Sequence, residues 1–189
     1  MTAAQNSNHE KVQWRAKVRI DKYEADLDPY VQNLGRRFGE RTFFAENAPY
    51  ETIEVDGNLL MTAGANALWT ALSGGSVGAF SAANAAIGVG DSTTASAASQ
   101  TNLQATVNAA RVGMSSGYPA VTNNQIQFQA TFSGSTANFA WNEWGVFNAI
   151  GAGSPPTGGV MLNRAVPSGG LGVKASGSTW TLTVTLSLS

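Results

Sequence analysis

Few residues in this chain of 189 could carry acid–base chemistry. After residue 57 the only carboxylates are Asp91 and Glu143. General acid–base catalysis needs two titratable groups that meet in a cleft, and no other catalytic signature accompanies this pair. A Ser/His/Asp arrangement would need His9, the single histidine, which lies in a polar leader. We therefore expect a protein that is not an enzyme.

Metal and cofactor sites have equally little support in the sequence. The chain contains no cysteine, which excludes disulfides and thiolate metal sites. The segment Asp91–Thr94 offers one carboxylate where a calcium loop needs several. Gly88-Val89-Gly90 lacks the later glycine of a dinucleotide fingerprint and the Gly-Lys-Ser/Thr of a phosphate loop. We expect neither a metal nor a cofactor.

Glu143 lies between Trp141 and Trp144, among bulky aromatic residues. Its simplest role is that of a partly buried acid, which pairs with Arg111, Arg164 or Lys174 or accepts backbone hydrogen bonds at a strand corner. Binding of a ligand or of a neighbouring subunit is the alternative role.

Three tryptophans of the second half, Trp141, Trp144 and Trp180, have two interpretations. Exposed together, they would form a platform on which sugar rings stack. Their placement on alternating strands instead favours packing in the core or at a subunit interface. We expect the core or an interface, with glycan stacking as the alternative.

Charged residues divide the chain into two segments. Of the 23 charged residues, 18 lie between Glu10 and Asp56, and only five follow. Soluble domains carry charge on roughly a quarter of their residues, so a long neutral segment indicates a surface that other protein covers. The sequence predicts an extended charged arm with a short strand over residues 1–56, and a β-domain over residues 57–189.

Net charge and hydropathy exclude two classes of partner. A formal net charge of −1 provides no field that attracts nucleic acid or an anionic membrane. No apolar run approaches the ~20 residues that span a bilayer, and the first residues are polar where a signal peptide is apolar. We expect neither nucleic acid nor membrane as a partner, and synthesis in a cytoplasm.

Most of the elements that position these residues are predicted strands. Apolar and polar residues alternate over residues 12–20, 50–55, 125–132 and 179–188. Apolar or aromatic runs add strands over residues 85–89, 138–148 and 160–166. With one or two short helices, this series is typical of a mainly β fold, an antiparallel β-sandwich or jelly-roll-like domain, here preceded by the arm.

Helical spacing predicts one helix over residues 59–72, with Leu68, Trp69 and Leu72 on its apolar face. Gly64 lies on the same face and costs about 1 kcal/mol relative to alanine, which indicates a close approach of backbone or of an aromatic ring. A second, short helix is predicted over residues 99–110, with Leu103 and Val107 pointing inward.

The strand over residues 179–188 has an apolar face that begins at Trp180 and an opposite face of threonine and serine. Hydroxyl groups without charge can face water, or they can press against a symmetry mate that satisfies them. Uncharged strands at a free edge aggregate unless covered, so we expect self-association, preferably as a three-fold ring. The residues expected in the core or at the self-contact are Trp69, Phe128, Phe132, Trp141, Glu143, Trp144, Phe147 and Trp180.

Several segments, taken in order, resemble small structural proteins of tailed-bacteriophage virions. Residues 84–105 contain an Ile-Gly-Val-Gly strand, a Thr/Ala turn and a Thr-Asn-Leu segment. Residues 141–148 contain an acid-x-Gly-aliphatic-Phe strand, and residues 159–164 and 174–185 resemble the strands that close this domain. The resemblance covers about residues 57–189. It implies a β-sandwich of the kind found in capsid decoration (cement) proteins and in tail appendages.

Together, the resemblance and the charged arm imply a capsid decoration protein on the outer surface of the virion. Its β-domain would form a homotrimer, and its arm would bind the major capsid protein. The residues expected at this contact are Trp14, Arg15, Tyr23, Tyr30, Arg36, Arg37, Phe38, Arg41, Phe43 and Phe44. The alternative is a tail or head appendage, a fibre or baseplate protein that binds host-surface glycan.

Overall fold

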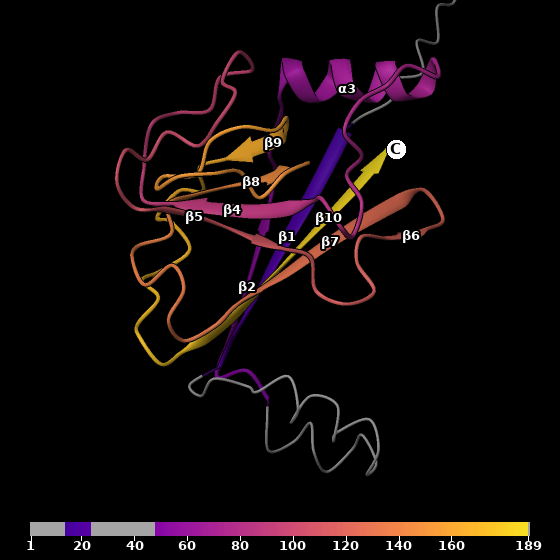
Figure 1. Cartoon of the computed structure of the whole chain (residues 1–189). Coiled ribbons are helices and arrows are strands. Elements are labelled where there is room, and N and C mark those ends of the chain that lie inside the picture. The colour runs from indigo at the N-terminus through magenta and orange to yellow at the C-terminus, as the bar shows by residue number, and fades with distance from the viewer. Residues whose placement is uncertain (1–13, 24–47, 189) are drawn as a thin grey trace, which may run out of the picture.

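In the computed structural model the chain forms a β-sandwich, which confirms the mainly β fold predicted from the strand pattern. The structure describes residues 14–23 and 48–188. Two antiparallel sheets of five strands pack together, and among the described residues one helix, α3, lies across one end of them (Figure 1).

The first sheet has the strand order β2-β1-β10-β7-β6. Its strands are β1 (Trp14–Tyr23), β2 (Glu51–Asp56), β6 (Ala120–Thr122), β7 (Gln125–Phe132) and β10 (Thr179–Leu188). The predicted bounds of β7 and β10 are those of the structure. The central strand β10 pairs along its whole length with β1, from Trp14 opposite Leu188 to Tyr23 opposite Thr179.

β1 and β2 are strands of the sandwich, although the charge pattern grouped both with the arm. Val18 and Ile20 of β1 are completely buried, opposite Val184 and Leu182 of β10. The period-two pattern of β1 is the physical reason, because its apolar face finds cover only in the core while its basic face stays in solvent. The charged segment therefore contributes two strands to the fold.

The second sheet has the strand order β3-β9-β8-β4-β5. Its strands are β3 (Leu59–Leu60), β4 (Ala86–Gly90), β5 (Ala109–Gly113), β8 (Glu143–Phe147) and β9 (Met161–Ala165). Every residue of β4, β8 and β9 is buried, so both faces of these strands are covered. β8 is shorter than the strand predicted over residues 138–148, whose first part makes only an isolated bridge from Ala140 to Val173.

The helix α3 (Thr62–Leu72) packs against β9 through Gly64. A Cβ atom at Gly64 would overlap the carbonyl oxygen of Leu162, so no larger residue fits at this backbone distance. The close approach predicted from this glycine is confirmed.

The predicted apolar face of this helix is only partly covered by the fold. Leu68, Trp69 and Leu72 are exposed, and the buried residues of the helix are Gly64 and Ala67. The reason is that α3 meets the sheet along its small residues, which lets the backbones approach and turns the larger apolar side chains away.

Residues 99–110 do not form the predicted helix; the chain there is irregular until β5 begins. Leu103 points inward as predicted, but Val107 is 72% exposed. Two backbone N–H groups of this segment donate to the carboxylate of Glu143. These bonds to a distant side chain replace those that a helix would make to its own carbonyl groups.

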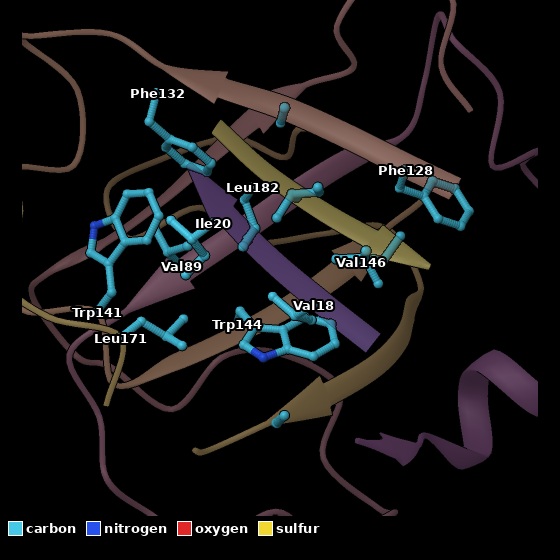
Figure 2. Packing of buried hydrophobic residues seen from close by; sticks show 14 of the residues in the cluster. Val18, Ile20, Val89, Phe128, Phe132, Trp141, Trp144, Val146, Leu171 and Leu182 are labelled. Carbon is cyan, nitrogen blue, oxygen red and sulfur yellow. The ribbon is translucent and has the colours of Figure 1, made fainter. Parts of the chain in front are cut away.

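The core between the sheets contains several large aromatic side chains (Figure 2). Trp141 makes edge-to-face contacts with Phe132 and with Trp180, with ring centroids 4.7 and 4.8 Å apart. Its indole N–H donates to the carbonyl oxygen of Ala137 at 2.9 Å. Aromatic pairs of this kind add roughly 0.5–1.5 kcal/mol beyond their burial, so they help to hold the segment before β8 against β7 and β10 of the first sheet.

Candidate interaction surfaces

The tryptophans considered for glycan binding lie inside the fold. Trp141, Trp144 and Trp180 have almost no exposed surface. A sugar ring cannot stack on a buried indole, so the glycan platform proposed for these residues is wrong. Of the other residues expected in the core or at the self-contact, four are buried and one, Trp69 on α3, is exposed. The buried ones are Phe128, Phe132, Glu143 and Phe147.

Glu143, at the start of β8, pairs with Arg164 of β9. Arg164 Nε donates to Glu143 Oε2 at 2.6 Å, and neither side chain is exposed. Glu143 also accepts the backbone N–H groups of Gln104 and Ala105 at 3.0 and 2.7 Å. An unpaired charge in the interior would cost several kcal/mol, and these bonds offset that penalty. Of the three cationic partners left open by the sequence, Arg164 takes this role.

The remaining donors of Arg164 hold the loop between β4 and β5. Its Nη1 donates to Gln100 Oε1 and its Nη2 to the carbonyl oxygen of Thr94, both at 2.8 Å. A Cβ atom at Gly90 would lie 2.6 Å from Glu143 Oε1, so the glycine leaves space for the carboxylate. The ion pair therefore fastens this loop to the second sheet and is closed to solvent.

Arg111 and Lys174 are buried as well. The guanidinium of Arg111 lies 3.5 Å above the ring of Phe147 and donates to two backbone carbonyl oxygens of the loop over residues 149–158. Burial lowers the pKa of Arg111 to about 10, because desolvation penalises the charged form. Lys174 Nζ donates to a backbone carbonyl oxygen and to Asn138 Oδ1, both at 2.7 Å.

As a result, the surface of the fold after Asp56 is almost without charge. Four of the five charged residues in this part are buried, and the fifth, Asp91, is only partly exposed. Soluble domains normally spread charges of both signs over their surface. The exposed charges of the described residues are instead concentrated on β1 and β2.

The outer face of the first sheet is divided between charged and neutral side chains. On β1 and β2, Lys17 Nζ lies 2.7 Å from Glu54 Oε2, and Arg19 Nη2 lies 2.9 Å from Asp21 Oδ1. Exposed pairs of this kind contribute only about 0–1 kcal/mol each to stability. This half of the face therefore provides fixed charges at the surface rather than a source of stability.

On β10 and β7 the outer face consists of hydroxyl and amide groups that pair across the strands. Gln127 Nε2 donates to Thr185 Oγ1 at 3.2 Å, and Gln129 Nε2 donates to Thr183 Oγ1 at 3.1 Å. Such cross-strand pairs stabilise a sheet from within. The threonine face thus finds hydrogen-bond partners inside one copy and does not need a symmetry mate to supply them.

An apolar groove of about 310 Å³ is lined by residues of α3, of the start of β1 and of the end of β10. These three elements meet at one end of the sandwich in Figure 1. The walls of the groove include Trp14 of β1, Leu68 of α3, Phe80, Ile126 of β7, and Leu186 and Leu188 of β10. Trp14 Nε1 donates to Asn58 Oδ1 at 2.9 Å, which orients the indole. Val121, 73% exposed, also lines this groove.

Next to the groove, α3 presents a ridge formed by Trp69 and Leu72, which are 67% and 78% exposed. No residue of α3 and none of the groove's lining residues is charged. Apolar side chains gathered around a hollow mark surfaces where proteins meet. Helical spacing had identified Leu68, Trp69 and Leu72 as one apolar face, but it did not reveal that this face is uncovered.

Three residues predicted for the capsid contact lie in the described part of the chain. Trp14 is half-buried in the groove, Arg15 is exposed on the outer face of β1, and Tyr23 is half-buried at the end of that strand. The others lie outside the described residues: Tyr30, Arg36, Arg37, Phe38, Arg41, Phe43 and Phe44. Sequence analysis missed the groove residues Phe80 and Val121, which carry no motif.

Within residues 14–23 and 48–188, no group of three or more His, Cys, Asp or Glu side chains could hold a metal ion. The same part of the chain has no helix with the length and apolar character needed to cross a membrane. In comparisons with known proteins, no family model, no curated protein and no solved structure matches the chain.

Proposed function

We propose that this chain is a non-enzymatic structural protein of a tailed-bacteriophage virion, a capsid decoration (cement) protein on the outer surface of the head. It binds the major capsid protein of the assembled shell through the charged segment over residues 1–56 and self-associates through the β-domain. The observation that carries this proposal is the almost uncharged exterior of the β-domain, with exposed apolar side chains beside the groove. Such an exterior suits a protein that works while covered by others.

The position of the charges supports a separate contact with the shell. Arg15, Lys17 and Arg19 lie on the outer face of β1, beside the acidic residues of β2. Charges on one face can pair with the complementary charges of a partner, which sets orientation and association rate more than affinity. Apolar anchors of the same segment would supply the affinity.

A decoration protein works by linkage. If it binds the expanded, assembled shell but not its free subunits, every bound copy favours the assembled state. Decorated shells should therefore disassemble at a higher temperature and at a higher denaturant concentration than bare shells. Glycan binding by an appendage remains the alternative, but the buried tryptophans remove the platform on which it depended.

Shell binding is tested with two variants that leave the sandwich strands in place. Removing residues 1–45 as one block would also remove β1, a strand next to the centre of the first sheet. The backbone N–H of Tyr50 donates to the carbonyl oxygen of Lys22 at 2.8 Å, so the chain ends that flank residues 24–47 are adjacent. Residues 24–47 are therefore replaced by Gly-Ser-Gly in one variant, and residues 1–13 are deleted in the other.

Binding to expanded shells is measured by co-sedimentation, and folding of each variant is checked by circular dichroism and thermal unfolding. We expect the full chain to decorate shells and to raise their melting temperature, and the variant without residues 24–47 to remain folded but bind at least about tenfold more weakly. A folded variant that binds as well as the full chain would show that this segment does not make the contact. Failure of the full chain to bind shells would refute the decoration function itself.

A further inference from the structure

We infer that the ridge of α3 and the groove beside it are the two parts of one self-association contact, in which the ridge of one copy docks in the groove of a second copy of this chain. This contact rests on the self-association included in the proposed function and names the surface responsible. Because the ridge lies next to the groove, two copies can dock reciprocally about a two-fold axis, and a contact repeated in one direction forms a ring where its rotation closes.

Ridge and groove match in chemistry and in scale. Trp69 and Leu72 project from α3, and both are more than half exposed. The groove of about 310 Å³ is at the lower end of pocket sizes, so it accommodates protruding side chains rather than a large ligand. Its floor includes Phe128, Leu162 and Leu186, which already belong to the buried core. A docked ridge would thus extend the core of one copy into its neighbour.

The absence of charge favours a second copy as the occupant. Residues 57–90 and 112–142, which supply the ridge and much of the groove, contain no charged residue. Like charges that face each other across an interface cost several kcal/mol, and identical copies carry identical charges. On the outer face of β1, two copies could bring Lys17 and Arg19 close to their own equivalents. The α3 end of the molecule has no such penalty.

The chain's own segments outside the described residues do not suit the groove. Residues 1–13 continue from Trp14 at the groove, but their sequence is polar, with Met1 and Val12 as its only large apolar residues. Residues 24–47 join the fold at the opposite end of β1, about 30 Å away for a strand of this length, and eight of their 24 residues carry charges for which the uncharged groove offers no partner. We therefore expect a second copy of the chain, rather than these segments, to cover the apolar walls of the groove.

A matched pair of valines tests this surface in the full chain. Val121 lines the groove, Val107 lies on the loop between β4 and β5, and their exposed fractions are 73% and 72%. In analytical ultracentrifugation, Val121→Ser and the ridge variant Trp69→Ser are expected to weaken self-association about tenfold or more, as interface anchors do. Val107→Ser removes the same apolar group elsewhere and is expected to leave association unchanged.

Cross-linking gives an independent measurement, because the chain contains no cysteine. Leu72→Cys and Val121→Cys chains, mixed and oxidised, are expected to form a disulfide-linked pair on a non-reducing gel. A mixture of Leu72→Cys and Val107→Cys chains serves as the control and is expected to stay unlinked.

Two outcomes would overturn the contact: a wild-type chain that stays monomeric at every concentration, or Val121→Ser and Trp69→Ser chains that associate like wild type. Neither measurement uses shells, so the result is independent of the shell-binding test. If the full chain binds shells but the ridge variants still associate, the decoration function is retained and this contact surface is rejected. If the ridge variants no longer associate and the full chain does not bind shells, this contact surface is retained and the decoration function is rejected.

Discussion

The guanidinium of Arg164 donates a hydrogen bond of 2.6 Å to the carboxylate of Glu143, and both side chains are shielded from solvent. This pair joins β8 to β9 and holds the loop between β4 and β5. Loss of one partner leaves the other charge buried without compensation, which is more harmful than loss of both. The pair therefore anchors a loop whose own sequence does not form a helix.

For this pair we expect Glu143→Gln to lower the free energy of unfolding by about 3–5 kcal/mol, because Arg164 remains buried and charged. Arg164→Leu should be similarly harmful. The double variant Glu143→Gln/Arg164→Leu should lose less than the sum of the two single losses, because it no longer contains a buried arginine charge without a partner. Urea unfolding of the four proteins measures this coupling, and additive losses would mean that the two groups do not interact energetically.

Gly64→Ala should destabilise the protein, although alanine is the better helix former. The new Cβ would overlap the carbonyl oxygen of Leu162, and overpacking of this kind costs about 1–3 kcal/mol, which outweighs the gain of about 1 kcal/mol in helix propensity. Asn66→Ala, at an exposed position of the same helix, is the control and should leave stability unchanged or slightly raised. Thermal unfolding distinguishes the two, and a stabilised Gly64→Ala variant would contradict the close approach.

Stability should fall at alkaline pH in part through Tyr23. Burial, and secondly the nearby Asp21, raise the pKa of Tyr23 above its ordinary value of 10.0. The folded state then holds the phenolic proton to higher pH than the unfolded state, so this contribution is complete below pH 10 and is lost as pH rises through the folded pKa.

Replacement of this tyrosine tests the sign of the effect. The free energy of unfolding, measured with urea, should decrease from below to above pH 10 in both proteins, and the decrease should be smaller in Tyr23→Phe than in wild type. Tyr50→Phe, at a more exposed position, is the control. An unchanged pH dependence in the Tyr23→Phe protein would mean that its phenol ionises equally easily in both states.

Acrylamide should quench mainly the fluorescence of Trp69. Trp141, Trp144 and Trp180 are buried and Trp14 is half-buried, whereas Trp69 is 67% exposed. Trp69→Phe should therefore remove most of the quenchable emission of the dilute protein, and Trp144→Phe should retain it. If copies associate through the ridge, quenching of the wild-type chain should also decrease as its concentration rises.

Local patterns predicted several parts of this fold correctly. Strict alternation gave the bounds of β7 and β10, because a period of two over eight to ten residues leaves little ambiguity. Gly64 predicted a close backbone approach, because a glycine in a helix needs a packing reason. Burial of Glu143 beside a cation was also predicted, but the choice of Arg164 over Arg111 and Lys174 depended on strand order.

Other predictions failed where a distant contact overrides local preference. Residues 99–110 have helical spacing, yet two of their N–H groups bind Glu143 instead of carbonyl groups of the same segment. Residues 14–23 share the charge density of the arm, yet their apolar face lies in the core. Charge composition therefore did not predict which strands belong to the sandwich.

By itself, the sequence determined which side chains share a face, because the periods of strands and helices are local properties of the chain. It predicted the apolar faces of β1, β10 and α3 alike. Only the tertiary structure decided which faces are covered: β1 pairs with β10 from the opposite end of the chain, while Trp69 and Leu72 of α3 remain in solvent. The physical reason is that an apolar face is buried by segments that are distant in the sequence. The positions of those segments follow from packing of the whole fold rather than from any local pattern.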